Sequence, residues 1–249
     1  MNVDEDEVVT TITDTTAKSS SFATGSEGPA IRVRGLNHFF GEGELRKQIL
    51  FDVDFEIAAG EVVILTGPSG CGKTTLLSLV GGLRAIMEGS VQVLGRELYG
   101  ATREEIIASR RQTGFVFQLH NLLDFLTARQ NVEMSVQLDA AISVRERKHR
   151  AEAMLAKVGL ANRLDYYPTA LSGGQRQRVS IARALAGEPR LILADEPTAA
   201  LDSHSGRQAV ELVQAMAREQ GCTVLMVTHD TRILDIADRV VRMEDGRML

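Results

Sequence analysis

The feature that most constrains the fold of this 249-residue chain is the segment from Gly67 to Thr74, which reads Gly-Pro-Ser-Gly-Cys-Gly-Lys-Thr. It fills every fixed position of the pattern G-x-x-x-x-G-K-[ST], follows the apolar run of residues 62–65 and precedes a leucine-rich run with helical spacing. In such a strand-to-helix turn, glycines let backbone N–H groups point inward, and the positive end of the helix dipole faces the same space. The sequence therefore predicts a triphosphate site rather than a simple glycine-rich turn.

The side chains of this loop have separate expected roles. Lys73 is expected to reach the β- and γ-phosphates as a mobile positive charge. The Thr74 hydroxyl is expected to bind Mg²⁺, because this ion prefers oxygen ligands. The predicted nucleotide-binding set of the loop is Gly67, Pro68, Ser69, Gly70, Cys71, Gly72, Lys73, Thr74 and Thr75.

Residues 1–28 carry six acidic residues and one lysine, so their net charge of −5 equals that of the whole chain. They are rich in Ser and Thr, lack periodicity and lack the basic and apolar regions of an export signal, so we predict a disordered acidic tail. Residues 29–249 are predicted to form one nucleotide-binding domain. No segment has the roughly 20 apolar residues that cross a bilayer, and two cysteines without ligand spacing fit a reducing cytosol.

Polar residues follow three further apolar runs, and each run has the composition of a buried strand. Ligands of open α/β sheets bind at the carboxyl ends of the strands. We assign Asp195 to Mg²⁺ and its neighbour Glu196 to the role of general base, because adjacent side chains on a strand diverge. Gln118 is expected to join the metal or the attacking water, although a lone Gln is more often a surface amide. His229 is expected to bind the γ-phosphate.

Small residues also precede a second long helical run, in the sequence Leu-Ser-Gly-Gly-Gln at residues 171–175. The Ser172 hydroxyl and the N–H groups of Gly173 and Gly174 would be free to hold phosphate oxygens at this helix start. The chain therefore has two predicted phosphate sites but only one complete nucleotide motif.

The remaining segments indicate two subdomains. Period-two alternation between residues 31 and 57 predicts antiparallel strands, and Phe40 is preferred over Phe39 to stack on a purine base, with packing as the alternative. From about residue 119 to 175 helical spacing dominates. The basic run of residues 145–150 is interleaved with Glu and is interpreted as a solvated helix face rather than a nucleic-acid surface.

In this order, the motifs resemble those of the ATP-binding subunits of ABC transporters, over residues from about 31 to the C-terminus. Beside the phosphate loop, or Walker A motif, the matching residues are the Q-loop at Gln118, the signature at 171–175, Walker B at 191–196, the D-loop at 200–202 and the H-loop at His229. The signature is the most specific of these. The resemblance implies an α/β fold of the P-loop NTPase class, with a RecA-like core, an antiparallel β subdomain and a helical subdomain at about 119–175.

The resemblance also implies a head-to-tail homodimer that holds two ATP molecules with Mg²⁺. Each ATP would lie between the phosphate loop of one chain and the signature of the other. The residues that the signature and the D-loop would contribute to nucleotide binding are Ser172, Gly173, Gly174, Gln175 and Asp202. The catalytic set would be Lys73, Gln118, Glu196 and His229.

More narrowly, the sequence is similar to the LolD and MacB export group and to DevA-type subunits of glycolipid exporters, through residues 81–84 and 120–132. This likeness implies membrane permease subunits docked at residues 119–132, a periplasmic adaptor, a place on the cytoplasmic face of the inner membrane, and export of a lipid, glycolipid or lipoprotein. The alternatives are a soluble ABC ATPase acting on DNA or the ribosome, or a regulatory subunit that does not hydrolyse ATP. One cassette, no heptads and a neutral core disfavour the first, and we expect no nucleic-acid partner. Glu196 and His229 disfavour the second.

Overall fold

A computed structural model describes residues 28–139 and 141–249, so the predicted acidic tail lies outside the described residues except for Gly28. The central sheet has six strands in the order β10-β9-β3-β8-β7-β6, all parallel except β10. Their bounds are β3 Val62–Thr66, β6 Thr113–Val116, β7 Leu191–Asp195, β8 Thr223–Val227, β9 Arg239–Glu244 and β10 Arg247–Met248.

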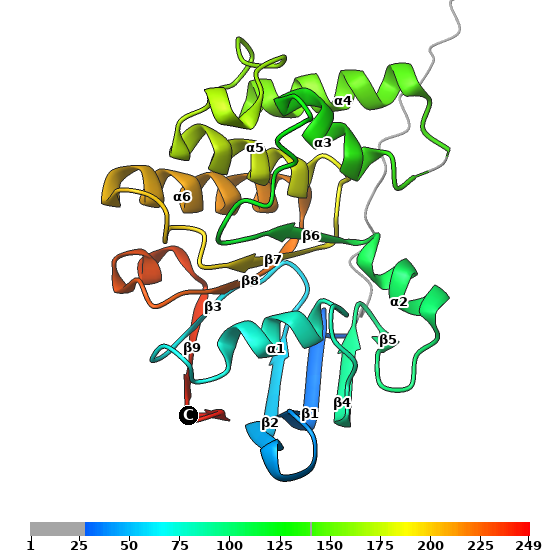
Figure 1. The fold of residues 1–249 in the computed structure, drawn as a ribbon, viewed down its shortest axis with the longest axis vertical. Coiled ribbons are helices and arrows are strands. Elements are labelled where there is room, and N and C mark those ends of the chain that lie inside the picture. The colour runs from blue at the N-terminus through cyan, green and yellow to red at the C-terminus, as the bar shows by residue number, and fades with distance from the viewer. Residues whose placement is uncertain (1–27, 140) are drawn as a thin grey trace, which may run out of the picture.

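Strands β3, β7 and β8 are continuous apolar runs because both faces of the sheet are covered. Alternate residues divide between two hydrophobic clusters: Ile64 belongs to one and Leu65 to the other. Figure 1 shows the corresponding layers, with α3, α4, α5 and α6 on one side of these strands, and α1 with an antiparallel sheet on the other.

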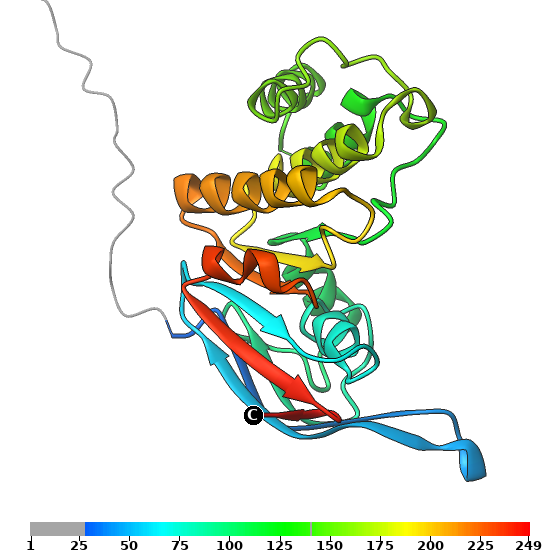
Figure 2. The same ribbon diagram turned by 90° about the vertical axis from the view of Figure 1, so that its left-hand side faces the viewer.

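The antiparallel sheet has the strand order β2-β1-β4-β5. Its strands are β1 Ile31–Phe40, β2 Lys47–Ile57, β4 Glu88–Val93 and β5 Arg96–Glu97, and a short 3-10 helix, Gly43–Leu45, joins β1 to β2. Figure 2 shows this β1–β2 pair in blue, projecting from the rest of the fold. The register of the pair shifts at three places between Val33 and Phe39. Helix α1, Lys73–Val80, adds its leucines to the same core, and α2, Arg103–Arg110, leads into β6.

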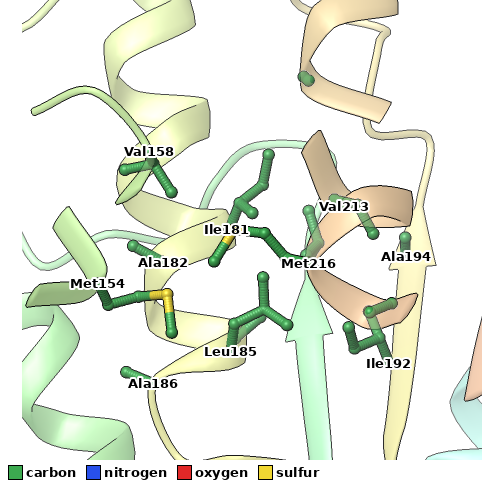
Figure 3. Packing of buried hydrophobic residues seen from close by; sticks show 14 of the residues in the cluster. Met154, Val158, Ile181, Ala182, Leu185, Ala186, Ile192, Ala194, Val213 and Met216 are labelled. Carbon is green, nitrogen blue, oxygen red and sulfur yellow. The ribbon is translucent and has the colours of Figure 1, made fainter. Parts of the chain in front are cut away.

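On the opposite side, the helices are α3 Ala128–Val136, α4 Val144–Lys157, α5 Gly173–Leu185 and α6 Ser203–Gln220, with 3-10 helices at Pro168–Ala170 and Thr231–Ile236. Figure 3 shows how α5 is buried: Ile181 and Leu185 meet Met154 of α4, Val213 of α6 and Ile192 of β7. Helix α5 is therefore held between the other helices and the sheet.

This architecture is the predicted one, and its fold class is confirmed by the comparison with solved structures given below. The boundaries of the helical subdomain stay a prediction, but α3 and α4 lie within the proposed range of about 119–175. In α4, Arg150 pairs with Glu146 and Glu188, and Lys148 lies near Glu152. These pairs agree with a solvated face for the basic run.

Candidate functional site

A cavity of about 400 Å³ lies at the carboxyl edge of the parallel sheet. It forms there because β3, β8, β7 and β6 are consecutive neighbours, so the residues that follow these strands reach one edge. The residues that line it are Phe40, Ile49, Ser69, Gly70, Gly72, Lys73, Thr74, Thr75, Gln118, Glu196 and His229. The fold thus brings the phosphate loop together with the predicted residues from three other strand ends.

The backbone of the phosphate loop requires glycine at both of its ends. Gly72 has φ +107° and is the N-terminal cap of α1, and a Cβ there would lie 2.7 Å from Leu50 Cδ2. Gly67 has φ +151°, and a Cβ there would overlap the Met243 carbonyl oxygen. The first turn of α1 therefore opens directly onto the cavity, with its free N–H groups at the positive end of the helix dipole.

Lys73 is a nearly buried cation, only 6% exposed. Its Nζ donates to the carbonyl oxygens of Gly67, at 2.7 Å, and Pro68, at 2.8 Å, and lies 3.8 Å from the buried Cys71 Sγ. Within residues 28–139 and 141–249 no carboxylate pairs with it. A buried ammonium without an acidic partner fits an anionic ligand, so this cradle suits the phosphates of a nucleotide.

Thr74 and Asp195 form the part of the site that suits Mg²⁺. Thr74 Oγ1 donates to Asp195 Oδ1 at 2.9 Å. Burial raises the pKa of Asp195, and the adjacent Glu196 charge raises it further, while the Thr74 hydrogen bond and Lys73 act in the opposite direction. A divalent cation would offset this crowding of negative charge. The described residues contain no cluster of three or more His, Cys, Asp and Glu side chains for a metal.

Glu196 lies outside β7, which ends at Asp195. Its φ of +46° is uncommon for a residue other than glycine, and its N–H still pairs with the Val227 carbonyl oxygen at 2.9 Å. His229 Nδ1 lies 2.8 Å from Glu196 Oε1, and the Thr228 hydroxyl donates to Oε2 at 3.3 Å. The divergence of the two carboxylates therefore comes from a left-handed turn, not from strand alternation as the sequence suggested.

Phe40 contributes a phenyl ring to the wall of the cavity. Phe40 lines the cavity, and the Arg84 guanidinium lies 4.9 Å from the centre of its ring. Phe39 is instead covered by Arg46, at 3.8 Å from its ring centre. This arrangement supports Phe40 as the stacking residue, which stays a proposal.

The signature residues lie elsewhere on the chain. Ser172 and Gln175 form a capping box on α5: Ser172 Oγ accepts from the Gln175 N–H at 3.2 Å, and Gln175 Oε1 accepts from the Ser172 N–H at 3.0 Å. Both, with Gly174, line a separate hollow of about 270 Å³. The Ser172 oxygen thus accepts one hydrogen bond within α5, and its hydroxyl proton remains able to donate to a phosphate oxygen.

Asp202 is likewise a helix cap, because its carboxylate accepts from the N–H groups of His204 and Ser205 at the start of α6. One chain therefore does not bring Ser172 or Asp202 to the nucleotide cavity. Two residues of the site escaped sequence reasoning. Ile49 is an ordinary apolar strand residue, and Thr228 carries no motif of its own beside His229.

Comparison with known proteins identifies the family. The model of the ABC transporter family matches residues 50–199. The chain belongs to the ABC transporter family. It is 46% identical over 222 residues to a macrolide export ATP-binding/permease protein, MacB 1 of Aeromonas hydrophila, covering 89% of this chain and 34% of that relative. The chain spans about a third of the length of the MacB relatives that it matches.

A shorter ABC relative matches along nearly its whole length. The lipoprotein-releasing system ATP-binding protein LolD 2 of Rhodospirillum rubrum is 43% identical over 222 residues, which are 89% of this chain and 96% of that protein. Among solved structures, the dimeric ATP-binding cassette MJ0796, in a post-hydrolysis state with ADP and Pi, superposes with a TM-score of 0.81. It is 38% identical and covers 88% of this chain and 96% of that cassette.

These findings confirm the predicted family and fold, and they support the ATPase and export predictions rather than an action on DNA or the ribosome. The MJ0796 cassette that this chain resembles was solved with ADP and Pi bound. No helix in the described part of the chain is both long enough and apolar enough to cross a bilayer.

Proposed function

We propose that this chain is the ATP-binding and ATP-hydrolysing subunit of an ABC exporter. The observation that carries the proposal is the single cavity shared by the phosphate loop, Gln118, Glu196 and His229. In this proposal ATP binding closes a dimer, hydrolysis opens it again, and the motion drives membrane partners. The domain is residues 29–249, with its helical subdomain at about 119–175.

The predicted site residues in and beside the cavity have separate chemical tasks. Lys73 and the N–H groups at the start of α1 hold the β- and γ-phosphates, and the Phe40 ring stacks on the adenine. Glu196 accepts the proton of the attacking water, and His229 orients Glu196 and binds the γ-phosphate. Thr74, Asp195 and Gln118 would hold Mg²⁺, which neutralises phosphate charge when it is bound.

The second phosphate site has a simple explanation in a homodimer. A nucleotide on one chain would be covered by Ser172, Gly173 and Gly174 of a second copy in head-to-tail orientation, with Gln175 and Asp202 beside them. The MJ0796 cassette, similar over 88% of this chain, was solved as a dimer, which supports this arrangement. Hydrolysis would then require two chains.

We further propose that the surface of residues 119–132 receives a membrane permease, because Leu119 and Phe125 are large, exposed apolar side chains there. The chain would then sit on the cytoplasmic face of the inner membrane, and a periplasmic adaptor could join through the permease. The names of the MacB and LolD relatives support export, and we propose a lipid, glycolipid or lipoprotein as the substrate.

The test is Glu196→Gln, which keeps the size of the side chain and one acceptor oxygen but removes the base. We expect ATP hydrolysis to fall by at least about 100-fold, while ATP binding remains and a stable dimer accumulates with MgATP. Light scattering and phosphate release measure the two effects. Glu219→Gln is the matched control, because Glu219 is an exposed carboxylate paired with Lys157. Hydrolysis at the parental rate by Glu196→Gln would exclude the base assignment.

A further inference from the structure

The turn that follows Gln118 has an unusual backbone. His120 has φ +65° and Asn121 has φ +48°, so two consecutive residues other than glycine occupy the left-handed region. The turn sends Leu119 outward, with 79% of its surface exposed, and His120 inward, with 6% exposed. Such a conformation persists only where the surroundings hold it, and it is concentrated at functional segments.

Arg183 of α5 stabilises this turn through two hydrogen bonds. Its Nη2 donates to the His120 carbonyl oxygen at 2.7 Å and its Nη1 to the Asn121 carbonyl oxygen at 2.6 Å. Ser180, one turn earlier on α5, donates its hydroxyl to the His120 carbonyl oxygen at 3.3 Å. Arg183 is half-buried, and burial lowers its pKa. In the described part of the chain Arg183 has no carboxylate partner, so the two carbonyl groups are the hydrogen-bond acceptors of its guanidinium.

The boundary between this turn and α5 also contains buried polar groups without partners. His120 Nδ1 and both amide atoms of Gln177 make no hydrogen bond within the described residues, and Gln177 is 1% exposed. On α5, Gly173, Gln177 and Ser180 share one face by their spacing. The Arg183 fork therefore crosses a boundary whose polar groups are only partly satisfied, and the His120 ring also lies near the backbone of Gly173.

We propose that Arg183 is a positioning residue that couples Gln118 to the signature motif, an inference that rests on the proposed function. Gln118 lies in the nucleotide cavity. Helix α5 begins at Gly173, which in the proposed dimer faces the nucleotide bound to the second copy. Arg183 joins the turn after Gln118 to this helix. When a γ-phosphate draws Gln118 inward, Arg183 carries the displacement to α5 and sets the place of Ser172 and Gly174 in the dimer.

The planar guanidinium suits this task because it holds two successive carbonyl groups at once. A lysine ammonium at the same place could keep the charge but not the fork. Arg183→Lys should therefore leave nucleotide binding to the monomer within about twofold of wild type and lower kcat about tenfold. Arg147→Lys is the matched control, since Arg147 of α4 also donates to a backbone carbonyl, that of Ile142 at 2.9 Å, away from the Q-loop.

The decisive experiment combines Arg183→Lys with Gln118→Ala and measures kcat, KM, monomer affinity and melting temperature. If Arg183 acts through Gln118, the double variant is no slower than Gln118→Ala alone. A double variant whose kcat is reduced by the product of the two single effects overturns the proposal, as does a wild-type kcat in Arg183→Lys.

If Arg183→Lys fails to fold, Ser180→Ala tests the same coupling between α5 and the turn. This variant removes only the 3.3 Å hydrogen bond from the Ser180 hydroxyl to the His120 carbonyl oxygen. Its loss of kcat should vanish in the Gln118→Ala background, and a loss that persists there overturns the proposal. A wild-type protein that hydrolyses no ATP at any concentration would instead refute the proposed function, so the two failures are distinguishable.

Discussion

Asp195, the proposed Mg²⁺ ligand, lies in an environment that disfavours its charge. Burial raises the pKa of this carboxyl above its ordinary value of 3.8, so the folded chain without ligand holds its ionised form at a cost. A raised carboxyl pKa means that the folded state binds more protons than the unfolded state. The free energy of unfolding therefore falls as pH rises through the window between the ordinary and the raised pKa.

We predict that Asp195→Asn stabilises the nucleotide-free protein at neutral pH, because the amide carries no charge to desolvate. Each 1 kcal/mol gained would raise the melting temperature by about 2–4 °C in a chain of this size. The gain should be largest above the raised pKa and should disappear below pH 3.8. The same variant should lose Mg²⁺-dependent hydrolysis.

The measurement is the melting temperature of the wild type and of Asp195→Asn over a pH series. Asp165→Asn is the control, because Asp165 is an exposed partner of Arg129. An equal or lower melting temperature for Asp195→Asn at neutral pH would contradict the prediction.

Single residues mark where sequence reasoning succeeded and where it stopped. The strand-to-helix turn of Gly67 to Thr74 was predictable because the fixed glycines of its pattern meet the needs of its backbone. The left-handed backbone of Glu196 was not, since nothing in an Asp-Glu pair signals a positive φ. Phe39 and Phe40 could not be separated by alternation alone, because the register of β1 shifts between His38 and Phe39.

Among the elements, α5 combines a structural and a proposed functional role at its first turn. Ser172 and Gln175 form a capping box there, and Thr102 and Glu105 form the same motif on α2. A capping hydroxyl stabilises a helix by about 1 kcal/mol. The two helices therefore allow the structural contribution of Ser172 to be separated from its proposed contact with a nucleotide.

We predict that Ser172→Ala and Thr102→Ala each lower the free energy of unfolding by about 1 kcal/mol, because each removes one cap. Only Ser172→Ala should also reduce ATP hydrolysis, by at least about tenfold, since it alone removes a donor from the composite site. Denaturant melts and steady-state rates check both halves. A loss of activity in proportion to stability in both variants would leave Ser172 with a structural role only.

The types of the elements were largely predictable from the sequence, but the pairing of strands and the packing of helices were not. Strands β3, β7 and β8 can be recognised in the sequence as apolar runs, because both of their faces are buried. The pairing of β4 with β1, across residues 41–87, depends on contacts distant in sequence, which local periodicity does not encode. The position of α5 between α4, α6 and the sheet likewise follows from packing around Ile181 and Leu185.

At the scale of the whole molecule, the two predicted phosphate-binding segments lie at separate hollows of one chain. The cavity with Lys73, Glu196 and His229 lacks Ser172, which lines a different hollow. If the proposed head-to-tail dimer is correct, each complete site takes its phosphate loop from one chain and its signature from the other. The rate per chain should then rise with protein concentration.

This arrangement predicts complementation between two inactive variants. Lys73→Ala removes the phosphate-binding cation but keeps the signature, and Ser172→Ala does the reverse. A mixed dimer would contain one site with both an intact Lys73 and an intact Ser172. At a one-to-one ratio, half of the dimers are mixed and half of their sites are intact, so roughly a quarter of the wild-type rate should return if sites act independently. The measurement is phosphate release at several mixing ratios, with each variant alone as the control. Mixed dimers must be shown to form. If they form and the activity stays at the sum of the two separate variants, a site shared between chains is ruled out.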